Sequence, residues 1–286
     1  MAETKIKIDH LKLKYDTKSP KKNLFFSKNI NPDAVFIGQS DGYVLDVVSL
    51  DIKEGEFHIF LGASGCGKST LLNIIAGFLQ KTDGEIKIDE RDITKPGSDR
   101  GVVFQNADQA IYPWLNVYKN VEFGLKLQHK KKEERRPIVE KAIELVGLSE
   151  HKNKYPNELS GGMKQRVQIA RSLASDPEIL IMDEPFGALD AQTRKTLQDE
   201  LIHIWKETRK TILFVTHDLQ EAVYLGEKIS IFSAAPNAHI AAQVDVPFEY
   251  PRNMNSHEVA AFTHEVHLRL DEAINAHGEG EVDKSA

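Results

Sequence analysis

Residues 62–70 read Gly62-Ala63-Ser64-Gly65-Cys66-Gly67-Lys68-Ser69-Thr70, and the rest of the chain is organised around this stretch. It fits the pattern G-x-x-x-x-G-K-[ST]. The apolar run at 57–61 before it predicts a buried strand, and the run at 71–77 after it has helical spacing and ends at a glycine. A glycine-rich loop between a strand and a helix is the context in which this pattern binds phosphate groups.

The residue types in this loop suit a bound nucleoside triphosphate with Mg²⁺. Gly62, Gly65 and Gly67 let the backbone wrap closely enough for its N–H groups to point at phosphate oxygens. Lys68 is expected to reach the β- and γ-phosphates, and the Ser69 hydroxyl to hold Mg²⁺. The alternative is a glycine turn that happens to precede Lys-Ser, and the flanking strand and helix weigh against it.

Length and composition bound the class of protein. The 286 residues are enough for one or two domains, and 41% hydrophobic and 28% charged residues are typical of a soluble protein. No apolar run is long enough to span a membrane, and the N-terminus does not read as a secretory signal. The single cysteine excludes an internal disulfide and fits a reducing cytosol. The net charge of −6 argues against nucleic acid as a partner.

The order of the predicted elements indicates an α/β fold. Strands are predicted at 5–15, 43–52, 57–61, 85–89, 101–105, 179–182, 211–216 and 229–232. Asp83-Gly84 is a hairpin signal. Helical patterns fill 116–176 and recur at 189–210 and 256–276, whereas 278–286 looks disordered. This alternation predicts a mostly parallel sheet with a helical insertion.

Two acidic residues follow the apolar strand at 179–182. Asp183 has the placement of the residue that holds Mg²⁺ in phosphate-loop hydrolases. Glu184 is the next residue, and a carboxylate beside the metal can orient or deprotonate the attacking water. A strand that simply ends in two surface acids is the alternative.

A third motif resolves this choice. The stretch Leu159-Ser160-Gly161-Gly162-Met163-Lys164-Gln165-Arg166 closely resembles the signature sequence of ATP-binding cassette (ABC) ATPases. Gln105 matches that family's Q-loop glutamine, Ala188-Leu189-Asp190 its D-loop, and His217 its switch histidine. The resemblance covers residues 5–15 and about 41–235, and the motifs occur in the family's order and spacing.

The resemblance implies a fold, a division of the chain and a set of site residues. The fold would be a phosphate-loop hydrolase of ABC type, with a mixed sheet core, an antiparallel β part and an inserted helical subdomain at about 106–176. Residues 1–235 would form the cassette, with an atypical insertion at 16–40, and 236–286 a C-terminal extension. The expected catalytic residues are Glu184, His217 and Gln105, and the expected Mg²⁺ ligands are Ser69, Gln105 and Asp183. The expected ATP-binding residues are Tyr15, Gly62, Ala63, Ser64, Gly65, Cys66, Gly67, Lys68, Ser69, Thr70, Ser160, Gly161, Gly162 and Asp190.

The signature predicts a second anion site. Ser160 and two glycines precede a helix expected to begin near Met163, so backbone N–H groups gather at a helix N-terminus. One chain does not need two γ-phosphate cradles for one nucleotide. In the family, the signature of one subunit completes the site on the other subunit's phosphate loop, so the resemblance implies a head-to-tail dimer of ATPase subunits.

Three single residues have a second interpretation. Tyr15 matches the family's adenine-stacking aromatic residue, although a core tyrosine at a strand end is the alternative, and the insertion at 16–40 follows it directly. His217 follows a buried strand, so it could be a core histidine, but its match to the switch position favours a γ-phosphate contact. Cys66 is interpreted as a small filler residue and not as a nucleophile or metal ligand.

The run 111–121, Ile-Tyr-Pro-Trp-Leu-Asn-Val-Tyr-Lys-Asn-Val, is similar to a run of the nitrate, sulfonate and taurine importer subfamily. That likeness implies a separate membrane permease, a solute-binding protein and a peripheral location on the cytoplasmic face of the cell membrane. Because 111–115 includes a proline and two aromatic residues, it is expected to line a groove for a permease helix; packing in the helical core is the alternative. Rival functions are an exporter subunit and a soluble cassette ATPase acting on nucleic acid or ribosomes.

Overall fold

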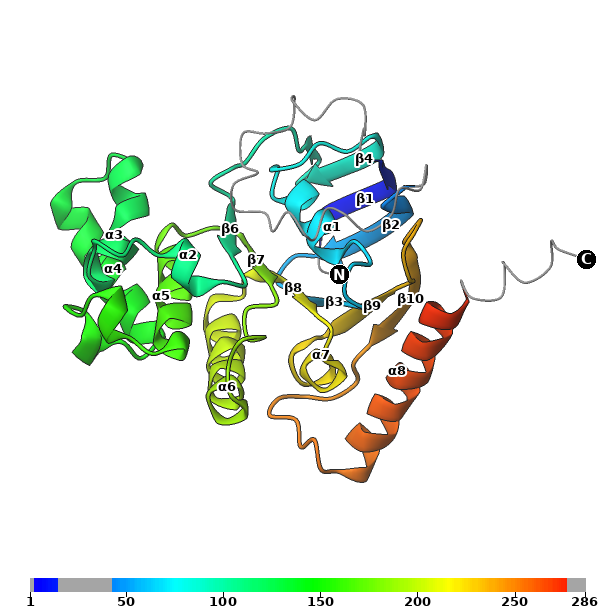
Figure 1. The fold of residues 1–286 in the computed structure, drawn as a ribbon. Helices are drawn as coiled ribbons and strands as arrows, with labels where there is room; N and C mark the ends of the chain where they lie inside the picture. The colour runs from blue at the N-terminus through cyan, green and yellow to red at the C-terminus, as the bar shows by residue number, and fades with distance from the viewer. Residues whose placement is uncertain (1–2, 15–42, 277–286) are drawn as a thin grey trace, which may run out of the picture. The chain divides into compact units, whose positions relative to one another are not determined.

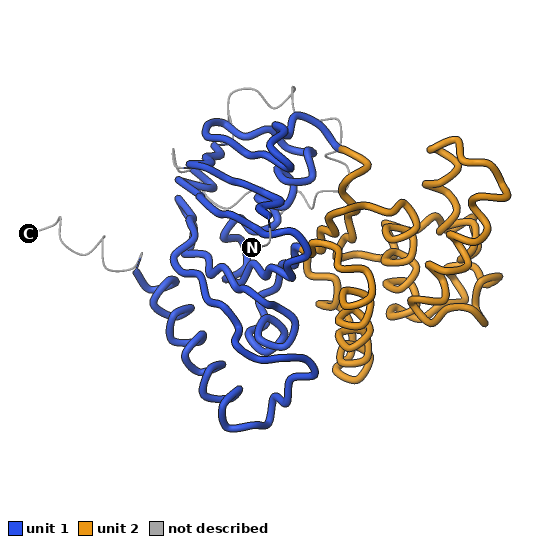
Figure 2. The backbone as a smooth tube through the Cα atoms, turned by 180° about the vertical axis from the view of Figure 1, so that it is seen from behind, with its two compact units in different colours: residues 1–96, 213–286 blue, residues 97–212 orange. Residues whose placement is uncertain are grey.

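The computed structural model describes residues 3–14 and 43–276. Tyr15, the segment 16–40 and the tail 278–286 lie outside the described residues. The chain divides into two compact units, Met1–Pro96 with Leu213–Ala286, and Gly97–Ile212, shown in blue and orange in Figure 2. None of the helices in the described parts of the chain combines the length and apolar character needed to cross a bilayer.

An antiparallel sheet belongs to the first unit. Its order is β2 (Leu45–Lys53), β1 (Thr4–Leu13), β4 (Asp83–Ile88) and β5 (Arg91–Asp92), and Figure 1 labels the first three of these strands. Ile6 of β1 pairs with Ile52 on one side and with Ile88 on the other, and all three side chains are buried. Largely alternating burial along β1 therefore gives this sheet one apolar face and one wet face, as the sequence predicts.

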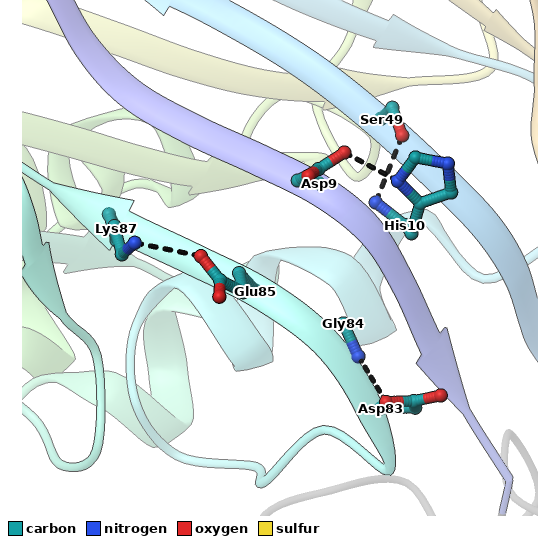
Figure 3. Close-up of polar contacts among 7 residues, drawn as sticks. All are labelled: Asp9, His10, Ser49, Asp83, Gly84, Glu85 and Lys87. Carbon is teal, nitrogen blue, oxygen red and sulfur yellow. Dashed lines mark hydrogen bonds and ion pairs between the residues drawn. The ribbon is translucent and has the colours of Figure 1, made fainter.

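The hairpin turn predicted at Asp83-Gly84 is wrong. These residues begin β4, and the turn is Asp89-Glu90, between β4 and β5, with φ values of 48° and 61° that suit a type I′ turn. Gly84 instead permits a close approach, because a Cβ there would lie 2.3 Å from the carbonyl oxygen of His10 in β1. The Asp83 carboxylate accepts a hydrogen bond from the Gly84 N–H at 2.8 Å (Figure 3).

A second sheet supplies the core of the first unit. Its strands there are β10 (Ile240–Asp245), β9 (Lys228–Phe232), β3 (Phe57–Leu61) and β8 (Thr211–Thr216), and the chain passes from the second unit to the first within β8. Strand β3 is parallel to β9, and β10 is antiparallel to β9. All residues of β3 and β8 are buried, which explains why both read as continuous apolar runs. The sequence reading missed β10.

Three helices lie in the described part of this unit. Helix α1 (Lys68–Ile75) follows β3, and α7 (Leu219–Leu225) follows β8 and contacts β3. Helix α8 (His257–Asn275) runs along β9, β10 and α7 (Figure 1). It buries Val259, Val266 and Ala273, which are spaced at seven residues and so share one face.

The second unit combines two strands with a set of helices. Strand β6 (Arg100–Val103) is parallel to β7 (Ile179–Asp183), with Val103 opposite Met182. The helices are α2 (Ala107–Ala110), α3 (Val117–Leu127), α4 (Lys132–Leu145), α5 (Gly161–Ala174) and α6 (Ala191–Thr208), with short 3-10 turns at Ser149–His151 and Pro156–Glu158. Helices α3, α4 and α5 pack on one another, and α2 packs on α5.

Helix α4 begins earlier than its apolar pattern suggests. The apolar spacing starts at Ile138, whereas the helix starts at Lys132 and takes in most of the charged stretch before it. The Glu134 carboxylate accepts a hydrogen bond from the Lys131 N–H at 2.9 Å, which satisfies a backbone donor at the helix N-terminus. The added turn is therefore stabilised by capping and not by burial.

Candidate functional site

The loop at 62–70 connects β3 to α1 in a backbone conformation that requires glycine. Gly67 caps the helix with φ at 96°, and a Cβ there would lie 2.7 Å from the Leu45 side chain. A Cβ on Gly62 would lie 2.9 Å from the Cys66 sulfur. The loop therefore has room only for backbone at these positions, as expected where main-chain N–H groups must converge on an anion.

Lys68 lies inside this loop and is 4% exposed. Its ammonium donates hydrogen bonds to the carbonyl oxygens of Gly62, at 2.8 Å, and Ala63, at 2.7 Å. It is also 3.6 Å from the Cys66 sulfur. A buried positive charge held by the loop backbone complements the charge of a phosphate.

Cys66 is 1% exposed, and its burial raises the pKa of the thiol against the opposing effect of Lys68. A buried thiol of raised pKa is a poor nucleophile. Its side chain packs against the position of Gly62, consistent with the filler role inferred from the sequence.

His217 follows β8, the neighbour of β3 in the sheet, and its side chain is exposed. The turn after it is held firmly. Asp218 caps α7 by accepting hydrogen bonds from the N–H groups of Gln220 and Glu221, and the Thr216 hydroxyl bonds to the buried Glu221 carboxylate at 2.5 Å. The core interpretation of His217 is therefore wrong, because the imidazole is exposed at a capped turn.

In the second unit, the structure brings Gln105 and Glu184 together. The Gln105 Nε2 lies 3.4 Å from the Glu184 Oε2, a long hydrogen bond. The contact arises because β6 and β7 are parallel, so the chain leaves both strands at the same edge of the sheet. Asp183 is the last residue of β7, and Glu184 follows it with φ at 42°. An amide and two carboxylates thus gather at one strand edge.

The residues predicted to hold Mg²⁺ carry oxygen donors, the kind of ligand that this ion prefers. Asp183, Ser69 and Gln105 offer one carboxylate, one hydroxyl and one amide oxygen, and Mg²⁺ prefers oxygen ligands. Residues 3–14 and 43–276 contain no group of three His, Cys, Asp or Glu side chains that could hold a metal on their own.

The signature residues lie in the first turn of α5, not before it. Ser160 is the N-cap, with its hydroxyl 3.3 Å from the Met163 N–H, and Gly161 is the first helical residue, so the predicted start near Met163 is two residues late. A Cβ on Gly162 would lie 2.5 Å from the Thr193 side chain, so glycine lets α5 approach α6.

Asp190 is the N-cap of α6 and lies close to the signature through Thr193. Its carboxylate accepts a hydrogen bond from the Thr193 N–H at 3.0 Å, and the hydrogen bonds from Thr193 lower the pKa of Asp190. The predicted signature and Asp190 thus meet at the adjoining first turns of two helices.

The run 111–115 forms a loop that presents one large aromatic side chain to solvent. Trp114 is 69% exposed, which rules out the core alternative for this residue, whereas Ile111 is buried. The Tyr112 ring packs against the Trp114 ring, with centroids 5.5 Å apart, and against the Phe123 ring, with centroids 4.6 Å apart. The fully buried Asn120 amide fixes the loop through the Tyr112 N–H at 2.8 Å and the Leu115 carbonyl at 2.8 Å.

The sequence reading missed Asn120 and the polar face of α5, which includes Gln168 and Arg171. Nothing in the local pattern marks Gln168 and Arg171, since Gln and Arg are ordinary on exposed helical faces, and Asn120 was quoted in the run 111–121 without a role. Only their hydrogen bonds to segments away from their own turn of helix reveal them.

Comparison with known proteins places the chain among transporter ATPases. Residues 45–187 match a family model described as ABC transporter. A nitrate import ATP-binding protein of Synechococcus elongatus is 47% identical over 210 residues, covering 73% of this chain and 76% of the relative. A taurine import ATP-binding protein of Rhizobium johnstonii is 50% identical over 206 residues, covering 72% and 78%.

A solved structure is similar over most of the described chain. It is a dimeric, post-hydrolysis ATP-binding cassette named MJ0796, bound to ADP and Pi. The match has a TM-score of 0.66 and 31% identity, and covers 85% of this chain and all of that one.

Proposed function

The chain belongs to the ABC transporter family, and we propose that it is the ATP-hydrolysing subunit of an importer for a small anion or related nutrient such as nitrate, a sulfonate or taurine. Its relatives are named as ATP-binding proteins of nitrate and taurine import, and the run 111–121 supports the same subfamily. The observation that carries the proposal is the contact between Gln105 and Glu184, next to Asp183, at the edge where β6 and β7 end.

The proposed reaction is the hydrolysis of ATP to ADP and phosphate. The Glu184 carboxylate accepts a proton from the attacking water, and Gln105 orients that water through its amide. The loop N–H groups and Lys68 balance the phosphate charge, and His217 contacts the γ-phosphate. Mg²⁺, held by Ser69, Gln105 and Asp183 together with the phosphates, would supply further charge stabilisation.

We propose that two ATPase subunits act together. Helix α5 has 14 residues, with Ser160 as its N-cap and Gly161 and Gly162 as its first two residues. The backbone N–H groups at the start of such a helix favour an anion. The proposal assigns them, with Asp190, to the nucleotide on the partner subunit's phosphate loop. The dimeric cassette with ADP and Pi, to which this chain is similar, supports this arrangement.

The permease is proposed to contact the exposed loop 111–115. Trp114 is a large aromatic side chain that is mostly in contact with solvent, and such residues dominate the energy of protein interfaces. A subunit bound to a permease in this way would sit at the cytoplasmic face of the cell membrane. A solute-binding protein would deliver the solute on the opposite side.

The Glu184→Gln substitution tests the catalytic assignment. It should retain ATP binding, nearly abolish turnover and accumulate an ATP-bound dimer, measured by phosphate release, equilibrium dialysis and size-exclusion chromatography. The matched control is Glu178→Gln, at the opposite end of β7, which should hydrolyse ATP normally. Near-normal turnover by Glu184→Gln would refute the role of this carboxylate.

The solute is tested separately. Uptake of labelled nitrate, taurine and bicarbonate would be measured in cells with and without the gene. Loss of uptake for one of these solutes on deletion identifies the substrate, and unchanged uptake of all three would place the importer outside this group.

A further inference from the structure

One face of α5 holds the segment that contains Gln105 and the exposed loop. Lys164, Gln168 and Arg171 are spaced at i, i+4 and i+7, so they form one stripe along the helix. We call these three residues the α5 stripe. Every hydrogen bond described below joins the stripe to residues 104–110, and all of these residues lie in the second unit.

Gln168 holds the residue immediately before Gln105. Its Oε1 accepts a hydrogen bond from the Phe104 N–H at 2.8 Å, and its Nε2 donates one to the Phe104 carbonyl at 3.0 Å. Gln168 is 1% exposed, so this two-point contact is shielded from water. Two hydrogen bonds to a single residue fix the orientation of the chain as it enters Gln105, and with it the direction of the Gln105 side chain.

The other two stripe residues hold the segment after Gln105. The Lys164 ammonium is 2.5 Å from the Asp108 carboxylate in α2. The Arg171 guanidinium donates to the Ala110 carbonyl at 2.6 Å and lies 5.4 Å from the centre of the Tyr112 ring, which in turn supports Trp114. Partial burial of Arg171 lowers the pKa of its guanidinium.

The same helix begins with the signature residues. Ser160 caps α5, and Gly161 and Gly162 form its first turn, so the helix joins them to the stripe through its own backbone hydrogen bonds. A helix is a stiff element, and a movement of its first turn is carried to residues further along. The contacts on Phe104, Asp108 and Ala110 then carry that movement to both sides of Gln105.

We propose that the α5 stripe is a positioning device that links the signature residues to Gln105 and to the exposed Trp114 loop. Lys164, Gln168 and Arg171 touch neither nucleotide nor permease; they act through the segment they hold. This inference rests on the proposed function, since it assumes that the signature residues engage a nucleotide in the ATP-bound dimer. It adds the route by which nucleotide binding reaches the surface assigned to the permease.

Trp114 itself provides the measurement. The chain has two tryptophans, and the other, Trp205, is buried in α6. In a Trp205→Phe, Glu184→Gln background, tryptophan fluorescence reports on Trp114 alone and ATP is not consumed. Acrylamide quenching of this fluorescence is compared with and without MgATP, while equilibrium dialysis with labelled ATP measures binding separately.

Four test variants and one control are compared with this parent. Gln168→Glu keeps an acceptor for the Phe104 N–H but loses the donor to its carbonyl. Lys164→Glu and Asp108→Lys each replace the ion pair with two like charges, and the double substitution restores it in reverse. Because Gln168 is buried and its variant could fold poorly, the Lys164–Asp108 pair supplies an independent test near the surface. Lys195→Glu, which alters an exposed ion pair with Asp199 on α6, is the control.

The expected result is a MgATP-dependent change in Trp114 quenching in the parent and the control. This change is lost in Gln168→Glu, Lys164→Glu and Asp108→Lys, although ATP still binds, and it returns in the double reversal. A purely structural role would lower stability without this pattern of loss and rescue. The proposal is overturned if the single variants respond as the parent does, or if the parent binds ATP with no change at Trp114. Failure of the parent to bind ATP would instead refute the proposed function.

Discussion

Replacing Trp114 with alanine should leave the fold intact and remove permease binding. The side chain is 69% exposed, so only about a third of its surface is packed against the protein. A tryptophan buries roughly 150–250 Å² when fully packed. A third of that area, at about 25 cal/mol per Å², corresponds to between about 1 and 2 kcal/mol, an upper estimate because the unfolded chain also buries some surface.

The second tryptophan is the matched control. Trp205 is 2% exposed and its ring lies 4.8 Å from the Arg209 guanidinium. The same substitution there creates a cavity and should cost about 3–5 kcal/mol. Two identical side-chain changes are thus expected to differ severalfold in their effect on the free energy of unfolding.

Urea unfolding and co-purification with the membrane permease would be measured for both variants. Trp114→Ala should unfold near the wild-type midpoint, bind ATP normally and lose the permease. If Trp114→Ala destabilises the protein as much as Trp205→Ala does, the loop is part of the core. If it keeps full permease association and transport, Trp114 is not part of the interface.

Three further predictions concern the first unit. Lys68→Ala should weaken ATP binding itself, measured by equilibrium dialysis, because it removes a buried charge from the loop; unchanged affinity would contradict that role. Cys66 should react with maleimide at neutral pH more slowly than a small-molecule thiol, because it is buried and its thiol pKa is raised. MgATP should slow this reaction further, and a rate equal to that of the small-molecule thiol would argue against burial. His58→Ala should cost about 2–6 kcal/mol in urea unfolding, because it takes a hydrogen-bond partner from two buried groups, each worth about 1–3 kcal/mol. These groups are the Glu56 carboxylate at 2.5 Å and the Ser230 hydroxyl at 2.9 Å, and an unchanged midpoint would refute this.

The elements that the sequence predicts well are those whose pattern comes from burial. Strands β3, β7 and β8 read as apolar runs because they are buried on both faces or nearly so. Helix α8 was predicted within one residue at each end, since Ser256 is a strong N-cap and its apolar residues share one face. The predictions were wrong where backbone geometry and not burial sets the bounds of an element, as at the β4–β5 turn and at the start of α5.

The sequence by itself determined the family, the nucleotide loop and the identity of the candidate residues, because glycines, a lysine and acidic residues at fixed spacings are needed for phosphate chemistry wherever they occur. Only the tertiary structure decided which of them meet. Gln105 and Glu184 are 79 residues apart in the chain and come into contact because β6 and β7 are parallel neighbours. In the same way, Gln168 became visible only through its contact with Phe104, 64 residues away. Local pattern encodes chemistry and periodicity, whereas contacts between distant segments arise only when the strands pair and the helices pack.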